Sequence, residues 1–454
     1  MTTDVEPPPP PLLPPQPLPP PPPLTPQPAA SDARPQFLGT SRDFRRLAIR
    51  GALLEFVTFG FYRFWLATQL RRHLWSNTLI DGEPLEYMGT AKELFIGFLF
   101  ALAILVPIYF LYFLAGIEAE RVRAFASAPL FLFFYAFGQF ANYRARRYRL
   151  TRTTWRGVRF WMEGSGFGYA WRGCLWGLLV YLTVGLALPW RAAALERYKM
   201  RRTHYGDLQG AFVGTGWQFF KQGWWLWLLA WLPLAVLIGG TLLAVVLLGA
   251  ADHAASGTGT SGLHGAGHRG AAHVDKLAIA TGAGVIIGCV IAAMLPFVYA
   301  AFKAAEWRWW LAGLRFGKLG IKSELKLDAL FGNYWATIGW SILFFSVFGL
   351  VLTAVVLGLG LARGEKLLES AIKQAMQGRS TAYLLLGLYF VTYLATLLAT
   401  GAAVRIFLLR GVWQKIMNSL RIEELAAAEA VTARGEAVNA LGEGFADSLD
   451  IAGF

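Results

Sequence analysis

The chain alternates long apolar runs with short polar connectors that are rich in arginine and lysine. Most of the apolar runs reach the ~20 residues that a helix needs to cross a bilayer. The pattern therefore predicts an all-α, polytopic membrane protein with about six to eight apolar helices. The apolar segments are residues 47–66, 94–116, 127–143, 169–190, 224–250, 277–302, 329–362 and 382–409.

A cassette at the end of two apolar segments occurs twice, and every matched pair is 125 residues apart. A fixed offset without gaps indicates a duplicated building block. The first copy contains Thr58, Gly60, Trp65, Arg72, Thr78, Gly89 and Thr90, and the second contains Thr183, Gly185, Trp190, Arg197, Thr203, Gly214 and Thr215. A fainter similarity joins residues 157–160, 313–316 and 419–422. We therefore expect three similar membrane units, over residues 37–160, 161–316 and 317–422.

Three stretches outside the apolar segments are expected to form two tails and a loop. Residues 1–36 are proline-rich, which favours an extended, disordered tail, or alternatively a docking ligand for a partner protein with an aromatic groove. Residues 251–276 are rich in glycine and histidine without periodicity, so we expect a flexible loop. Residues 423–454 are expected to form an acidic C-terminal tail.

Composition supports the membrane assignment and indicates the class of partner. Hydrophobic residues make up 56% of the chain and charged residues 15%, against about 25% charged residues in a soluble protein. The net charge is +14, and its positive residues lie between the apolar runs. We therefore expect anionic lipid headgroups as partners, and no nucleic acid. Cys174 and Cys289 both lie in apolar segments and predict no disulfide framework.

The distribution of arginine and lysine also predicts a topology. If every apolar segment crossed the membrane, the basic connectors 144–168 and 191–221 would face opposite sides, against the positive-inside rule. If segments 47–66 and 169–190 are instead re-entrant or interfacial, all basic connectors and both termini face the cytoplasm. We favour this arrangement, with about six crossings, and keep full crossing by every segment as the alternative.

Arg50 and Glu55 are charges inside the first apolar segment. Such charges are costly in a membrane unless they are paired or hydrated, and they often mark a functional site. The alternative is a shallow segment whose charged side chains reach the interface. The second copy of the cassette has Leu175 and Val180 at the matching positions.

Thr58-x-Gly60 and Thr183-x-Gly185 are candidates for breaks that turn a re-entrant helix. Glycine permits the turn, and threonine can bond to a carbonyl that the break leaves free. The alternative is close helix packing by small residues.

Other polar clusters give weaker signals. The glycine-rich loop holds loosely spaced potential metal ligands, for which we favour a solvated linker: Asp252, His253, His264, His268 and His273. Glu443, Asp447 and Asp450 could bind a cation or a basic partner, but a solvated tail is favoured. The sequence contains no phosphate-binding loop, catalytic triad pattern or dinucleotide fingerprint. We expect no catalytic, cofactor or metal site, and no enzyme.

Several of these residues resemble a known family. Phe37-x-Gly39, Thr58-x-Gly60-x-Tyr62-x-x-Trp65, Gly89-Thr90 and the ending Gly442-Glu443-Gly444-Phe445-Ala446-Asp447 are similar to domain of unknown function 898 (DUF898), also called the YjgN family. The resemblance extends over residues 37–454. It implies a multi-pass protein of the bacterial inner membrane, and it supplies no catalytic residue. The proline-rich N-terminus and the Gly/His loop depart from the family pattern.

Two functions are compatible with these patterns. Repeated units, broken apolar segments and intramembrane charges are typical of a transporter or channel-like protein for a small solute, ion or lipid, and we expect this function first. The alternative is a structural, envelope-organising protein that binds anionic lipid and protein partners. A hydrated cavity near Arg50 or Glu55 would favour transport, and a broad basic cytoplasmic face would favour the alternative.

Overall fold

The computed structural model describes residues 32–118, 123–256, 288, 293–358, 380–435 and 447. The prolines at 7–28, three of the loop histidines (His264, His268, His273), Glu443 and Asp450 lie outside the described residues. The expected start of the Gly/His loop at residue 251 is wrong, because helix α7 (Gly216–Ser256) continues beyond it.

The all-α prediction is wrong, because the polar connectors fold into β-hairpins. The described residues contain an antiparallel sheet of eleven short strands. In chain order the strands are β1 (Asp32–Ala33), β2 (Gln36–Phe37), β3 (Thr78–Ile80), β4 (Glu83–Tyr87), β5 (Thr153–Trp155), β6 (Val158–Met162), β7 (Thr203–Tyr205), β8 (Leu208–Phe212), β9 (Leu314–Phe316), β10 (Leu319–Ser323) and β11 (Leu420–Glu423).

The hairpins form because their turns carry residues that accept a left-handed backbone. Asp81 and Gly82 have φ of 53° and 79°, and Arg156 and Gly157 have φ of 50° and 73°. Two consecutive positive φ angles define the type I′ turn, whose twist matches that of paired strands. Gly206 and Gly317 begin the other two turns with φ of 55° and 57°. Each connector therefore reverses the chain and supplies two strands to the sheet.

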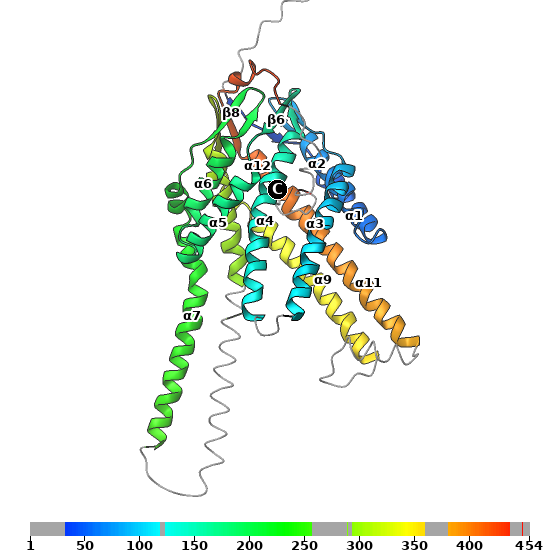
Figure 1. The fold of residues 1–454 in the computed structure, drawn as a ribbon, viewed down its shortest axis with the longest axis vertical. Helices are drawn as coiled ribbons and strands as arrows, with labels where there is room; N and C mark the ends of the chain where they lie inside the picture. Colours follow the sequence, from blue (N-terminus) through cyan, green and yellow to red (C-terminus); the bar gives the residue numbers. More distant parts are fainter. Residues whose placement is uncertain are drawn as a thin grey trace, which may run out of the picture.

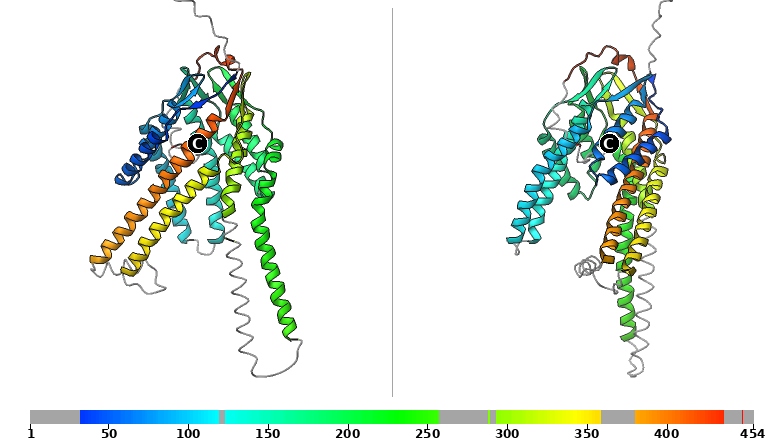
Figure 2. Two further views of the ribbon diagram at one scale, coloured as in Figure 1. Left: turned by 180° about the vertical axis from the view of Figure 1, so that it is seen from behind. Right: turned by 90° about the vertical axis from the view of Figure 1, so that its right-hand side faces the viewer.

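Helices alternate with these hairpins and extend from one side of the sheet (Figure 1). The short pairs are α1 (Ser41–Val57) with α2 (Arg63–Ser76) and α5 (Gly166–Leu182) with α6 (Leu188–Met200). The longer helices are α3 (Ala91–Glu118), α4 (Arg123–Thr151), α7, residues 293–313, α9 (Phe331–Gly358) and α11 (Ser380–Ala403). Helix α11 continues through a π-helix, η2 (Val404–Arg410), into α12 (Gly411–Asn418). The long pairs fan apart away from the sheet, as Figure 2 shows for α3/α4 and α9/α11.

Three helices among the described residues are long and apolar enough to cross a membrane: Ala91–Leu114, Phe331–Val355 and Tyr383–Asn418. Only 17%, 6% and 6% of their most apolar windows are buried within the protein. An apolar surface of this extent is stable against lipid rather than water. The chain is therefore a membrane protein, with its sheet at one end of these helices.

One short N-terminal segment joins the two ends of the sheet. Strand β1 pairs with β11, with Asp32 opposite Glu423, and β2 pairs with β3, with Phe37 opposite Thr78. Only Arg34 and Pro35 separate the two strands. The curled sheet encloses a small apolar core, which the short 3₁₀-helix η3 (Leu425–Ala428) covers at the top (Figure 1). The core residues are Ala33, Leu85, Trp155, Tyr205, Leu319, Ile422, Leu425 and Ala428.

The similar segments 157–160, 313–316 and 419–422 do not fall on strands in equivalent places of the fold. Residues 157–160 fall at the turn and start of β6, the second strand of its hairpin. The segments 313–316 and 419–422 fall on β9 and β11, each of which directly follows a helix. Strand β5 occupies that place after α4.

Candidate functional site

The matched Thr-x-Gly residues lie where each short helix pair turns. Thr58 caps the C-terminal end of α1, and Thr183 caps that of α5. The Thr58 hydroxyl donates to the Leu54 carbonyl at 2.7 Å and accepts from the Tyr62 amide at 3.0 Å. Thr183 makes the matching bonds at 2.8 and 3.1 Å. Gly60 and Gly185 have φ of 89° and 87°, so the apolar segments 47–66 and 169–190 each contain a break rather than one straight helix.

The matched Gly-Thr residues lie where a strand leads into a long helix. The hydroxyl groups of Thr90 and Thr215 accept from backbone amides in the first turns of α3 and α7, at 3.3 and 3.2 Å. Arg72 donates to the Gly89 carbonyl at 3.0 Å, and Arg197 donates to the Gly214 carbonyl at 3.4 Å. These matched residues therefore link the end of each strand to the start of the following helix by hydrogen bonds.

An aromatic ring two residues earlier explains why these joints need glycine. A Cβ at Gly89 would lie 2.5 Å from the Tyr87 ring, and one at Gly214 would lie 2.6 Å from the Phe212 ring. Gly39 is covered by Phe37 in the same way, and Arg410 donates to its carbonyl at 2.8 Å. This joint was not predicted, although a sequence signal for it recurs after β2, β4, β6 and β8. Three instances have an aromatic first residue: Phe37-x-Gly39-Thr40, Tyr87-x-Gly89-Thr90 and Phe212-x-Gly214-Thr215. The fourth, Met162-x-Gly164-Ser165, has methionine there and a positive φ of 97° at Gly164.

The tips of the short helix pairs are apolar and uncovered. Val57 and Phe59 are 71% and 74% exposed, and Tyr181 and Leu182 are 79% and 68% exposed. Trp65 and Trp190 follow the two turns and are also exposed. The start of α1 has the opposite character, with an exposed basic surface formed by Arg42, Arg45, Arg46 and Arg50. We call these four residues the α1 basic stem.

The structure separates Arg50 from Glu55. Arg50 is exposed on the stem, whereas Glu55 is buried, with 3% of its surface exposed. Arg405, in the π-helix η2, donates to both Glu55 oxygens at 2.6 and 2.9 Å. A bidentate pair of this kind satisfies a carboxylate that would be costly if buried alone. Arg405 was not predicted as the partner of Glu55, because the two residues are 350 positions apart in the sequence.

A second buried carboxylate, Asp447, lies between α2 and α4. Arg71 on α2 donates to both of its oxygens, one of them at 3.1 Å, and Arg149 on α4 lies 3.4 Å away. Arg71 also donates to the Tyr87 hydroxyl at 3.2 Å. The expectation of a solvated carboxylate at 447 is therefore wrong: the two arginines offset the cost of burying it.

Two more ion-pair networks join the helices α3, α4 and α6. Glu93 on α3 accepts from Arg152 at 2.9 and 3.1 Å and from the Tyr148 hydroxyl at 2.7 Å. Glu196 on α6 pairs with Arg146 and Lys199. Burial by itself favours the neutral acid, but these two cations hold the pKa of Glu196 to about 2. The basic connectors thus supply cations to the region directly beneath the sheet.

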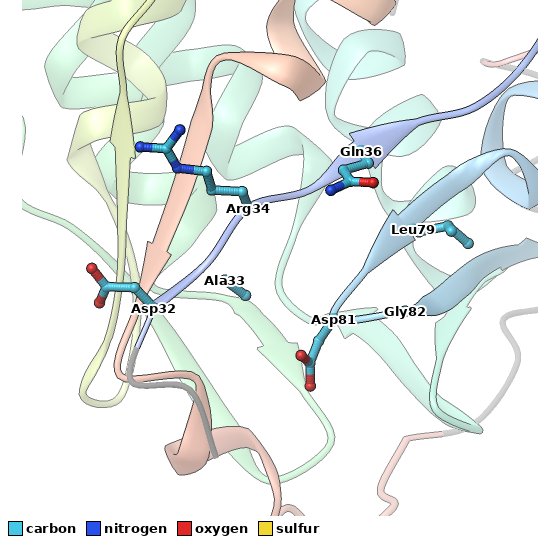
Figure 3. A pocket seen from close by; sticks show the side chains of 7 residues that line it. All are labelled: Asp32, Ala33, Arg34, Gln36, Leu79, Asp81 and Gly82. Carbon is cyan, nitrogen blue, oxygen red and sulfur yellow. The ribbon is translucent and has the colours of Figure 1, made fainter. Parts of the chain in front are cut away.

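A pocket of about 490 Å³ opens between the N-terminal strand segment and the β3–β4 turn. Its lining residues are Asp32, Ala33, Arg34, Gln36, Leu79, Asp81 and Gly82 (Figure 3). Asp81 is committed to an ion pair with Arg156 at 2.6 Å. In the described part of the chain, no group of three or more His, Cys, Asp or Glu side chains is placed to hold a metal ion. The polar, open pocket carries no evident chemistry.

Comparison with known proteins identifies the family. The model for the bacterial proteins of unknown function DUF898 matches residues 32–363. No curated protein and no solved structure matches the chain. The match begins at β1, includes both copies of the cassette and ends just after α9. Because it spans well over half of the 454 residues, the chain belongs to the DUF898 family.

Proposed function

We propose that this protein is a multi-pass protein of the bacterial inner membrane that organises the membrane by binding anionic lipid headgroups beneath its sheet. Both termini and the sheet lie on the cytoplasmic side in this proposal. Basic residues concentrate on the sheet side of the long helices, as the positive-inside rule requires of a cytoplasmic face. The headgroups of anionic lipids attract such residues at this depth.

The observation that carries the proposal is the two-part character of α1. Its first turns present the basic stem, and its last turn and the following break present an uncovered apolar tip. From Arg50 to Val57 the helix advances only ~10 Å at about 1.5 Å per residue. This is enough to reach the boundary between headgroups and acyl chains, but not to cross a core of ~30 Å. The α1/α2 pair thus fits an interfacial anchor with cations at headgroup level.

The α5/α6 pair supports the same depth. Its tip carries Tyr181, Leu182 and Val184, all exposed. Trp190 is half-exposed just beyond the turn, as Trp65 is in the first pair. Tryptophan favours the interfacial zone because its ring is apolar and its indole N–H can bond to water or headgroups. Both pairs can therefore rest at one level while the long helices continue into the bilayer.

Lipid-dependent stability tests this function. We expect the melting temperature of the purified protein in detergent to rise when phosphatidylglycerol is added and to rise less with phosphatidylcholine. Arg45→Gln with Arg46→Gln should reduce the difference between the two lipids. Lys318→Gln with Lys322→Gln removes equal charge from the β9–β10 hairpin and serves as the matched control. Equal responses to both lipids in the unmodified protein would refute the proposal.

A transporter-like function is the second candidate, and the Glu55–Arg405 pair favours it. The pair joins α1 to a π-helix inside the apolar stretch Tyr383–Asn418. A π-helix inside an α-helix frequently marks a functional site, and paired charges at such positions mark ion pathways. Liposomes containing the protein and a pH-sensitive dye test this function. Proton or anion flux that Glu55→Gln abolishes would favour transport over lipid organisation.

A further inference from the structure

Arg71, Arg149 and Tyr87 converge on one small volume between α2, β4 and α4. All three reach it from elements at the sheet end of the first membrane unit. The carboxylate of Asp447 fills that volume, and only 2% of its side chain is exposed. The two arginine side chains are 12% and 13% exposed. The space around this carboxylate is therefore enclosed and cationic.

We propose that Arg71, Arg149 and Tyr87 form a binding site for a phosphate group, and that Asp447 from the chain's own C-terminal region occupies this site in competition with phosphate. A guanidinium presents parallel N–H donors that fit a carboxylate and a phosphate equally well. The Tyr87 hydroxyl lies beside the Arg71 fork at 3.2 Å and can donate to a phosphate oxygen. One site can therefore exchange the two anions.

The second copy of the cassette has no equivalent of the Arg71–Asp447 pair. Arg71 and Glu196 occupy matching positions, 125 residues apart. In the second copy the charge on α6 is balanced within the helices, because Glu196 pairs with Lys199 on its own helix and with Arg146 on α4. In the first copy the arginine meets a carboxylate 376 positions away in sequence. The anion at Arg71 is thus delivered from outside the membrane unit, which suits a replaceable occupant.

The energetics favour exchange over simple release. Removing the carboxylate alone would leave Arg71 largely buried without its counter-ion, and such a state is strongly disfavoured. A phosphate entering as Asp447 leaves would keep the positive charges balanced. The site lies next to Arg72, which holds the strand-to-helix joint at Gly89, so a change of occupant acts where the sheet meets the membrane helices. It is separate from the α1 basic stem and does not depend on lipid binding there.

The test uses full-length protein in detergent and follows phosphate binding by the shift in melting temperature, with chloride at equal ionic strength as reference. Asp447→Asn removes the competing charge but keeps the shape of the side chain. We expect the apparent affinity for inorganic phosphate to rise at least tenfold. Adding Arg71→Gln to that variant should abolish the gain. Glu429→Gln removes one negative charge from an exposed position in the same C-terminal region and should leave the phosphate response as in the unmodified protein.

Two probes separate the possible sources of phosphate. Binding of inorganic phosphate by Asp447→Asn supports a free phosphate ligand. A response only to mixed micelles containing phosphatidylglycerol, and not to phosphatidylcholine, supports a lipid headgroup. A chain ending at Gly435 lacks the carboxylate altogether and should show the same gain. If Asp447→Asn and the shortened chain both fold and neither responds to either probe more strongly than the unmodified protein, the proposal is overturned.

Discussion

Glu55 and Arg405 lie 350 positions apart in the chain and form a bidentate ion pair, with oxygen–nitrogen distances of 2.6 and 2.9 Å. The pair joins the first helix to the last membrane helix. It lies outside the duplicated cassette residues, because the second copy has an apolar side chain at the position of Glu55. This ion pair thus links α1 to the last apolar helix. The second copy cannot form the same pair, because Val180 stands at the position that matches Glu55.

Breaking this pair should destabilise the protein through the charge left behind. Glu55→Ala buries the Arg405 guanidinium without its partner, and we expect a loss of about 2–3 kcal/mol. Glu55→Leu with Arg405→Leu removes both charges and should lose much less. Thermal unfolding in detergent checks both values. Equal losses for the single and double variants would show that packing, not the ion pair, accounts for the effect.

The helix breaks should tolerate alanine poorly for reasons of backbone conformation alone. Gly60 has φ of 89°, and no atom lies within 4 Å of a Cβ placed there. Gly60→Ala should therefore cost roughly 1–2 kcal/mol from the left-handed backbone without any clash. Gly138 in α4 also has open space but carries no positive φ. Gly138→Ala should be neutral or slightly stabilising, so only Gly60→Ala should lower the melting temperature.

Acid should weaken the protein through Glu196. Arg146 and Lys199 hold the folded pKa of this buried carboxylate to about 2, below its ordinary value of 4.5. A depressed pKa contributes stability that is fully present above pH ~5 and is lost as the pH falls toward 2, by roughly 3 kcal/mol at most. Glu196→Gln should flatten the decline in melting temperature between pH 5 and 3. If Glu196→Gln leaves the decline in melting temperature between pH 5 and 3 unchanged, other carboxylates cause the acid sensitivity.

Single cysteines test the proposed topology. In a background without Cys174 and Cys289, cysteines at Arg147, Arg202 and Lys318 should resist a membrane-impermeant thiol reagent in intact cells. A cysteine at Gly262, after α7, should react. Opposite labelling at Arg147 and Arg202 would restore full crossing by every apolar segment, because those two positions flank the α5/α6 pair.

Among the described residues, three helices have the length and apolar character to cross a membrane, fewer than the six crossings expected. The sequence located these three helices and the positions of the two breaks because each signal is local. Twenty apolar residues, or Thr-x-Gly at a fixed offset, can be read within one window. The hairpins were missed although Asp81-Gly82 and Arg156-Gly157 sit at their turns. Strands of two to five residues are too short for an alternating pattern to emerge, and their basic side chains resembled those of ordinary connectors.

The candidate sites could be predicted only in part, since their partners come from distant segments. Glu55 was recognisable as an unusual charge, but nothing near it identified Arg405. Asp447 was visible as an acid in a tail, but its two arginines lie on α2 and α4. Ion pairs between distant segments depend on the tertiary fold, and the local hydrophobic pattern does not predict them.

The junction of β1 and β2 with opposite ends of the sheet also has a consequence for the timing of folding. The Phe37 amide donates to the Asn418 side chain, 381 positions later in the chain. A ribosome adding ~5–20 residues per second needs roughly 20–75 s to make that partner. Until then β11 is missing, and strand β1 has an unpaired edge of the kind that invites association with other chains. A truncated product cannot complete the sheet, so closure distinguishes finished chains from unfinished ones.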